Sequence, residues 1–263
     1  MTDELVHLDV AGTTATITLD SPSNRNALST DLVSGLLGHL QTAAATASVR
    51  CVVLTHTGGT FCAGADLAGA LKTGMSPDEA SAAGAQGLVR LMRAMLELPI
   101  PVIGRVDGHV RAGGFGLLGA CDMVVAGPSS TFALTEARLG LAPSVISLTL
   151  LSRMTSRAVS RYFVTGEKFG AQEAAAAGVI TVAADSPPDL DARVAGWVSD
   201  LAAGSPQGLR ESKRLATAAI REEFDRWADE RAAHSAALFS SEEAREGMAS
   251  FLQKRPPRWV SAP

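Results

Sequence analysis

The stretch that decides the fold is PIPVIGRVDGHVRAGGFGLLGACDMVVAG, residues 99–127. It begins with a short apolar segment, PIPVIGRVDG, of the kind found in strands buried on both faces. GGFGLLGA then predicts a helix entered through glycines, and DMVVAG predicts a further strand. Gly113, Gly114 and Gly116 fill three of four positions, although glycine loses much conformational entropy when it is ordered. We infer that some group must approach the backbone closely here, within an α/β fold built of βαβ-type units.

The same order of elements extends outward from this stretch. CVVLTHT (51–57) predicts another buried strand, and GGTFCAGADL (58–67) predicts the loop that follows it. Residues 5–20 alternate apolar and polar side chains around a Gly-Thr turn, which indicates a hairpin. After about residue 145 helices dominate, and the last of them covers the core or packs on a neighbouring subunit. We expect helices over these ranges: 31–45 (capped by Ser29 or Thr30), 77–98 and 206–239.

The composition is that of a globular protein without a strong charge bias. The chain has 263 residues, of which 46 % are hydrophobic and 19 % charged, and its formal net charge is −4. This balance gives no general attraction to nucleic acid or to an anionic membrane, so we expect neither as a partner. The N-terminus lacks a basic and apolar leader, and no apolar run reaches the roughly 20 residues of a membrane span. We therefore expect a cytoplasmic protein.

The cysteines do not form a pattern that carries chemistry. Cys51, Cys62 and Cys121 lie in apolar surroundings at no metal-ligand spacing. We expect buried, reduced thiols and no metal site. A nucleophilic Cys62 is an alternative, although no histidine partner is evident nearby in the sequence.

Two glycine-rich loops, TGGTFCAGADL (57–67) and GHVRAGGFG (108–116), each follow a predicted buried strand. Ligands in α/β folds usually bind at the carboxyl ends of strands, and glycine lets backbone N–H groups converge there without a Cβ in the way. Two such N–H groups would form an oxyanion hole for a carbonyl that becomes an enolate. Neither stretch has the G-x-G-x-x-G pattern of a dinucleotide site. Tight turns and close helix packing remain an alternative reason for these glycines.

Four motifs in order along the chain resemble the crotonase superfamily, that is, the enoyl-CoA hydratase/isomerase family. They are FCAGADL (61–67), PVIGRVDGHVRAGGFGLLGACDMVVAG (101–127), FALTEARLGLAPS (132–144) and VTGEKFGAQEAAAAGVI (164–180). EGMASFLQKRPPRW (246–259) in addition resembles the closing helix and tail of this family. The resemblance implies an α/β fold, the crotonase-like ββα-superhelix, with a C-terminal helical trimerisation region. It divides the chain into a core over residues 1–200 and a helical oligomerisation region over 201–263. It also implies a homotrimer or a hexamer.

The resemblance implies an acyl-CoA thioester as substrate, with no further cofactor. The backbone N–H groups of Ala65 and Gly113 would hold the thioester oxygen, and Glu136 would act as acid and base. Open alternatives are a solvated loop arginine for Arg25, a helix cap for Asp66 and a surface charge for Lys254. The residues expected to bind substrate or CoA are Asn24, Arg25, Ala27, Ala63, Asp66, Leu67, Gly114, Phe251 and Lys254.

The sequence departs from the family at one catalytic position. Hydratases of the family commonly use two glutamates; Glu136 matches the second, and Gly116 stands in place of the first. An apolar pocket would raise the pKa of Glu136, whereas a surface position or a salt bridge with Arg138 is the alternative. His109 and Arg111 are candidates to replace the lost carboxylate, and His56 is expected to be structural. The expected acyl pocket comprises Gly116, Arg111, Pro143 and Ser144.

These residues favour an enzyme, a lyase that adds water to a 2-enoyl-CoA through Glu136. TEARLGLAPSVIS is similar to the methylglutaconyl-CoA hydratase branch, which would pair Arg111 with a carboxylate on the substrate. A single carboxylate also suits a Δ3,Δ2-enoyl-CoA isomerase, since such an enzyme only moves a proton between carbons. Thioester hydrolysis and a catalytically weak acyl-CoA binding protein are further alternatives. RNA binding is disfavoured by the acidic balance.

Overall fold

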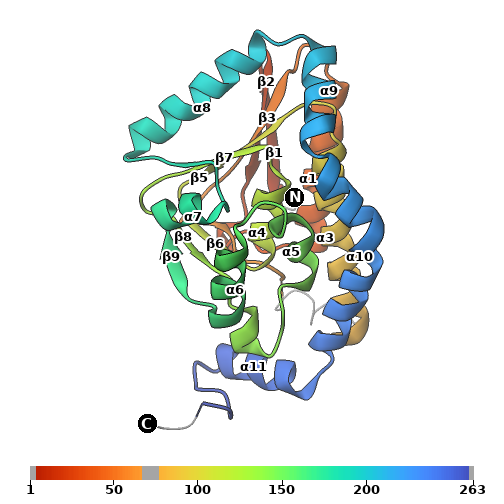
Figure 1. Ribbon diagram of the computed structural model, residues 1–263, viewed down its shortest axis with the longest axis vertical. Coiled ribbons are helices and arrows are strands. Elements are labelled where there is room, and N and C mark those ends of the chain that lie inside the picture. Colours follow the sequence, from red (N-terminus) through yellow and green to blue (C-terminus); the bar gives the residue numbers. More distant parts are fainter. Residues whose placement is uncertain (1–3, 67–76, 261–263) are drawn as a thin grey trace.

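Two β-sheets form the core of the computed structural model, which describes residues 4–66 and 77–260 (Figure 1). The larger sheet has six strands in the order β1-β2-β3-β5-β7-β10, and only its first pair, the predicted hairpin, is antiparallel. Its strands are β1 (Val6–Ala11), β2 (Thr14–Leu19), β3 (Cys51–His56), β5 (Val102–Val106), β7 (Met123–Ala126) and β10 (Val182–Ala183).

A smaller sheet of four short strands carries the loops of interest. In the order β4-β6-β8-β9, the first three strands run parallel and β9 is antiparallel to β8. Three times in succession a strand of the large sheet leads into a strand of the small one and then into a helix: β3-β4-α3, β5-β6-α4 and β7-β8-α5. This is the expected ββα-superhelix. The short strands are β4 (Thr60–Cys62), β6 (His109–Arg111), β8 (Thr131–Ala133) and β9 (Lys168–Gly170).

Helices cover both sides of the large sheet (Figure 1). The Ser29 side chain accepts a hydrogen bond from the backbone N–H of Leu32, so the expected cap of α1 is Ser29. The long helix α10 packs on α3 and α5, while α8 crosses the opposite side of the sheet. The helices are α1 (Thr30–Ala45), α3 (Pro77–Glu97), α4 (Gly113–Ala120), α5 (Ser144–Leu150), α6 (Ser156–Thr165), α7 (Ala171–Ala177), α8 (Pro187–Ala202), α9 (Pro206–Ala216), α10 (Ala218–Phe239) and α11 (Glu242–Leu252), with 3₁₀ turns η1 (Pro22–Asn24) and η2 (Glu136–Leu139).

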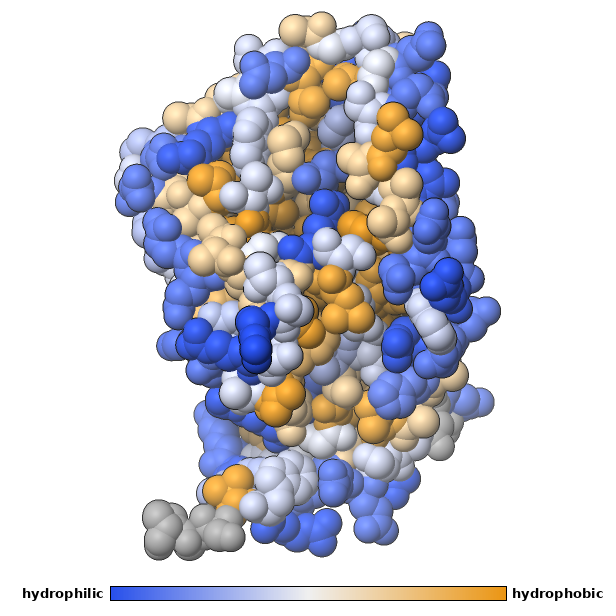
Figure 2. Space-filling model, in the orientation of Figure 1, coloured by the Kyte–Doolittle hydropathy of each residue, from blue (hydrophilic) through white to orange (hydrophobic). Residues whose placement is uncertain are grey.

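The C-terminal helices take part in the main core. Ile220, Phe224, Ala228 and Ala232 recur every four residues on one face of α10, and all four are buried in the same cluster as the sheet and α3. Figure 2 shows hydrophilic residues along the outer edge of this helix and hydrophobic residues over the middle of the face. Among the described helices, none is long and apolar enough to cross a bilayer. The expected oligomer and its C-terminal region stay predictions.

Candidate active site

The loops after β4 and β6 lie against each other. Gly64 belongs to the loop after β4 and has φ +92°. A Cβ atom built there would lie 2.7 Å from the Cβ of Ala112 and 3.4 Å from the backbone N of Gly113, the two residues that follow β6. The backbone N–H of Leu28 donates to the Gly64 oxygen at 2.8 Å, which fixes the position of the neighbouring Ala65. Ala65 and Gly113, predicted as a pair, therefore stand on adjacent turns. A side chain at position 64 would force these turns apart.

Gly113 is the first residue of α4, and the N–H groups of a helix's first turn have no acceptor within the helix. The preceding Ala112 has φ +44° and ψ −118°, a conformation that costs a residue with a Cβ on the order of 1–3 kcal/mol. Such strain persists where the surrounding structure enforces it, and here it turns the chain from β6 into α4. The helix thus begins at the edge of the small sheet with its partly positive end beside Gly64.

Helix α4 is buried on every side, and its glycines allow neighbouring elements to approach closely. A Cβ at Gly113 would lie 2.7 Å from Leu28, and one at Gly114 would lie 3.0 Å from the Cβ of Cys62. At Gly116 it would lie 2.6 Å from the sulfur of Met92. Close packing is therefore one reason for these glycines, and the expected role of the Gly113 N–H stays a prediction. Gly114, expected to contact CoA, packs against the core.

Glu136 follows β8 and opens the turn η2. Its side chain is buried, with 8 % of the residue exposed, and no described residue donates a hydrogen bond to its Oε2 atom. Burial raises the pKa of this carboxyl group to about 7. The alternative of a surface or salt-bridged glutamate is wrong, since the guanidinium of Arg138 donates instead to the Thr165 carbonyl at 3.0 Å. A buried carboxyl group that titrates near neutral pH is suited to acid–base catalysis.

The buried carboxyl group makes stability depend on pH. The pKa of Glu136 is higher in the folded chain than its ordinary value of 4.5. The contribution of its protonated form to the free energy of unfolding is therefore fully present below pH 4.5 and is lost as the pH rises through about 7. Glu136→Gln removes this dependence. In urea unfolding, we expect the free energy of unfolding of the variant minus that of wild type to increase by about 3 kcal/mol between pH 4.5 and pH 8. A difference that does not change with pH would contradict the raised pKa.

Ala65, Gly113 and Glu136 meet at one edge of the small sheet. They follow the ends of β4, β6 and β8, which are neighbouring parallel strands in that order. The carboxyl ends of parallel strands lie at the same edge, so the two turns after β4 and β6 and the buried carboxyl group after β8 follow the same edge of this sheet. Such a set can hold a carbonyl oxygen and move a proton on the atoms beside it.

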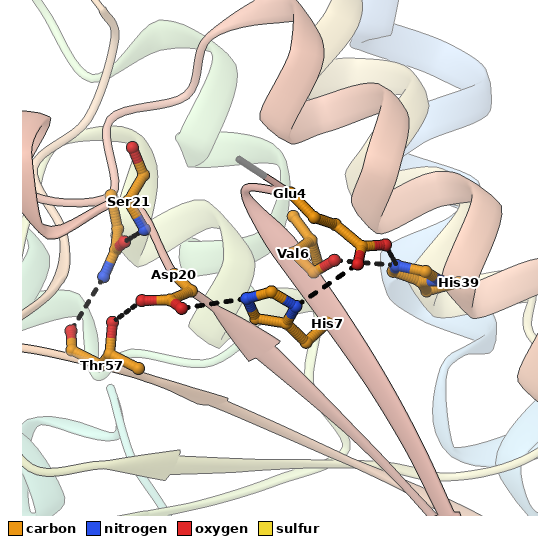
Figure 3. Close-up of polar contacts among 8 residues, drawn as sticks. Glu4, Val6, His7, Asp20, Ser21, His39 and Thr57 are labelled. Carbon is orange, nitrogen blue, oxygen red and sulfur yellow. Dashed lines mark hydrogen bonds and ion pairs between the residues drawn. The ribbon is translucent and has the colours of Figure 1, made fainter. Parts of the chain in front are cut away.

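The loop over residues 21–28 is held rigidly beside this edge. Asn26 is buried, with φ +53°; its side chain accepts from the Ser21 N–H at 2.6 Å and donates to the Thr57 and Thr60 carbonyls. Figure 3 shows Asp20 bridging the imidazole of His7, at 2.9 Å, and the hydroxyl of Thr57. Asn26 is not among the predicted site residues, although its place between Arg25 and Ala27 in a predicted loop indicates that it helps to position them.

Four predicted CoA-binding positions are brought together at this loop. The Asn24 side chain accepts from the Ala27 N–H at 3.3 Å, and the carbonyl of Arg25 accepts from the Ala63 N–H at 3.1 Å. Arg25 itself is exposed in the left-handed region, with φ +60°. Asp66 is partly buried, and Leu67 lies outside the described residues. The chain around positions 24–27 and 63–65 therefore forms one continuous surface.

A group of cations surrounds His109 on the outer side of the small sheet. Burial and the charges of Arg111, Lys168 and Arg25 lower the pKa of His109. The guanidinium of Arg111 donates to the Val110 and Thr131 carbonyls, both at 2.7 Å, and to the Thr131 hydroxyl at 2.9 Å. Arg111 is thus bonded across β6 and β8. Arg111 is not among the residues nearest to a Cβ built at Gly116, which are Met92 and Ile146. Pairing of Arg111 with a substrate carboxylate stays a prediction.

The remaining predicted residues have the following surroundings. Pro143 precedes α5, and the hydroxyl of Ser144, its first residue, lies 2.8 Å from Nδ1 of His234 on α10. Sequence analysis missed His234, which no motif marks. Phe251 is 61 % exposed on α11, and Lys254 follows it with φ +53°. Both lie at the end of the molecule where α11 and the C-terminal tail are drawn (Figure 1).

The surroundings of Cys62 and His56 are those of residues with a structural role. Cys62 is fully buried, its sulfur accepts from the Gly64 N–H, and burial raises the pKa of its thiol to about 12. A thiol that stays protonated at neutral pH is not a nucleophile, so that alternative is wrong. His56 accepts from the Asp107 N–H at 3.1 Å and packs edge-on against Phe61, as a structural residue does. Over residues 4–66 and 77–260, His, Cys, Asp and Glu form no cluster that could hold a metal ion.

Known proteins resemble this chain over nearly its whole length. A family model described as enoyl-CoA hydratase/isomerase matches residues 9–262. A crystal structure of an enoyl-CoA hydratase from Mycobacterium avium is 53 % identical, covers 98 % of this chain and 100 % of its own, and superposes with a TM-score of 0.91. The 2,3-dehydroadipyl-CoA hydratase of Escherichia coli is 31 % identical over 92 % of each chain. Carnitinyl-CoA dehydratase of Proteus mirabilis is 33 % identical over 81 % of this chain and 82 % of its own.

Proposed function

Since the chain belongs to the enoyl-CoA hydratase/isomerase family, we propose that it is a lyase that adds water to a 2-enoyl-CoA thioester. The resemblance to the crotonase superfamily is confirmed by this membership, and the fold class is confirmed with it. In the proposed reaction the N–H groups of Ala65 and Gly113 bind the thioester oxygen. Glu136 is the single acid and base.

The observation that carries the proposal is the environment of Glu136. The carboxyl group is buried, its Oε2 has no hydrogen-bond partner among the described residues, and its pKa is raised to about 7. It stands at the same edge of the small sheet as the two turns that present N–H groups. An unpaired buried carboxyl group costs free energy of folding, and sites that tolerate such a cost are commonly catalytic.

The residues present can perform both halves of the addition. The Glu136 carboxylate takes a proton from water while the water oxygen bonds to C3 of the acyl group. The C2=C3 electron pair moves toward the thioester, and the negative oxygen that develops is stabilised by the two N–H groups. Glu136 then returns the proton to C2. One carboxyl group thus gives and takes the same proton, and the product is a 3-hydroxyacyl-CoA.

Gly116 favours a second candidate, a Δ3,Δ2-enoyl-CoA isomerase. With one carboxyl group in the site, a proton removed from C2 can be returned to C4 without any water attacking C3. The same oxyanion hole would stabilise the dienolate. The two functions differ in product mass, because isomerisation leaves the mass unchanged. A catalytically weak acyl-CoA binding protein would bind these esters and turn over none of them.

The experiment that tests the proposal is turnover of a panel of thioesters with product identification by mass. Crotonyl-CoA, 3-methylglutaconyl-CoA and 2,3-dehydroadipyl-CoA cover short, branched and carboxylated acyl groups; the last is suggested by the name of the E. coli relative. A 3-enoyl-CoA completes the panel. Gain of one water from any 2-enoyl ester supports the hydratase. Turnover of the 3-enoyl ester alone would replace it by the isomerase.

Arg25 provides a test of how CoA is bound. Its exposed guanidinium, near the charges of Arg111 and Lys168, suits a phosphate of CoA. We expect Arg25→Ala to lower kcat/KM for crotonyl-CoA by roughly 10-fold at low salt and to leave crotonyl-pantetheine unchanged, because the latter lacks the nucleotide. Arg210→Ala, on α9, is the control. Equal losses with both esters would show that Arg25 does not contact the nucleotide.

A further inference from the structure

The space at Gly116, where the family has its first glutamate, is filled by two apolar side chains. A Cβ atom at this position would lie 2.6 Å from Sδ of Met92 and 2.9 Å from Cγ2 of Ile146. Both distances are shorter than real Cβ contacts, so even an alanine would require Met92 or Ile146 to move. Met92 is 0 % exposed and Ile146 3 %. The carboxylate is therefore missing, and its place is also occupied.

These side chains border the proposed thioester site. Gly116 lies one helical turn after Gly113 on α4, so both glycines share a face of that helix. The same face is covered from α3 by Leu88, 3.4 Å from a Cβ built on Gly113, and by Met92 one turn further along. C2 and C3 of an acyl group follow directly on the carbonyl carbon. A thioester oxygen held at Gly113 would place these carbons within about one helical turn of this apolar wall.

We propose that Met92 and Ile146 form a plug that excludes a second carboxylate and its water from the site, and that Met92 limits the size of the acyl group at C3. The inference rests on the proposed function for the orientation of the acyl group. Its physical basis is that a fully packed interior has no room for one extra methyl group unless something is removed. Shortening Met92 should therefore admit a larger acyl group.

Binding of saturated esters tests the specificity without any need for turnover. Isothermal titration calorimetry gives the Kd values of butyryl-CoA and 3-methylbutyryl-CoA, which differ by one methyl group at C3. We expect Met92→Ala to shift the ratio of the two Kd values toward the branched ester by about 10-fold. Met95→Ala is the matched control, since Met95 is also fully buried on α3. We expect it to leave the ratio within about threefold of wild type.

Thermal unfolding tests the plug itself. We expect Gly116→Ala to lower the Tm of the wild-type chain and to lower it clearly less in a Met92→Ala background, because the clash is then relieved. Equal Tm losses in both backgrounds would overturn the plug. Equal shifts of the Kd ratio in Met92→Ala and Met95→Ala, or no shift in Met92→Ala, would overturn the specificity role. Absence of turnover with every 2-enoyl ester would refute the hydratase while these two measurements still decide the plug.

Discussion

Glu136→Gln is expected to lower kcat for hydration of crotonyl-CoA by about 10⁴-fold, the upper end of the range for a single general acid–base group. The loss is large because, in the proposed mechanism with Gly116 in place of a second glutamate, one carboxyl group takes the proton from water and also delivers it to C2. The amide of glutamine keeps the size of the side chain and can do neither. The measurement is steady-state turnover, followed by loss of the enoyl absorbance.

Two controls separate chemistry from folding. Butyryl-CoA should bind the variant with a Kd within a few-fold of wild type, because the thioester contacts come from the backbone. Glu136→Asp, which keeps the carboxyl group but shortens the side chain, should lose less activity than the glutamine variant. The pH profile of wild-type kcat/KM should rise through about pH 7 as the carboxylate forms. Unchanged turnover in Glu136→Gln would remove Glu136 from the mechanism.

Gly64→Ala is expected to lower kcat by about 10²–10³-fold, the effect of losing one oxyanion-hole donor. At φ +92° a Cβ is strained, and here it would also lie 2.7 Å from the Cβ of Ala112 and 3.4 Å from the Gly113 nitrogen. The two turns must then separate, and the proposed oxyanion hole formed by the N–H groups of Ala65 and Gly113 is disrupted. The measurement is kcat with crotonyl-CoA at saturation, so that weaker binding does not enter.

The control for this variant is Gly12→Ala. Gly12 also has a positive φ, +60°, but a Cβ there would meet nothing within 4 Å. Both substitutions should cost about 1 kcal/mol of stability from backbone strain. Gly64→Ala should lose further stability from the close contact with Ala112, and only Gly64→Ala should lose turnover. If the two variants keep equal activity, the approach of the Gly64 and Ala112 turns is not what stabilises the thioester oxygen.

Patterns within the sequence predict several helices and five of the six strands of the large sheet, all except β10. The hairpin over residues 5–20 is β1 and β2, and CVVLTHT contains β3. These segments are long enough for periodicity to be visible, and burial on both faces leaves a continuous apolar run. The three-residue strands β4 and β6 lie within residues 57–67 and 108–116, which the sequence predicts to be loops. Strands this short show no alternation, and only their pairing across the small sheet defines them.

The candidate site depends on contacts between segments far apart in the chain, and these are harder to predict. The resemblance led to Ala65, Gly113 and Glu136, but not to the strain at Ala112 or to the packing of Met92 on Gly116. Tertiary packing decides both. The buried ion pair between Lys213 and Asp122, 2.9 Å apart, was likewise missed, because nothing in a charged helical segment marks one lysine as buried.

The most direct test of the proposed hydration is a single measurement. Crotonyl-CoA is incubated with the wild-type protein in water labelled with ¹⁸O, and the product is analysed by mass spectrometry with fragmentation. We expect a 3-hydroxybutyryl-CoA that carries one labelled oxygen on C3. Intact crotonyl-CoA after prolonged incubation, or label found only in a free acid released from CoA, would contradict it.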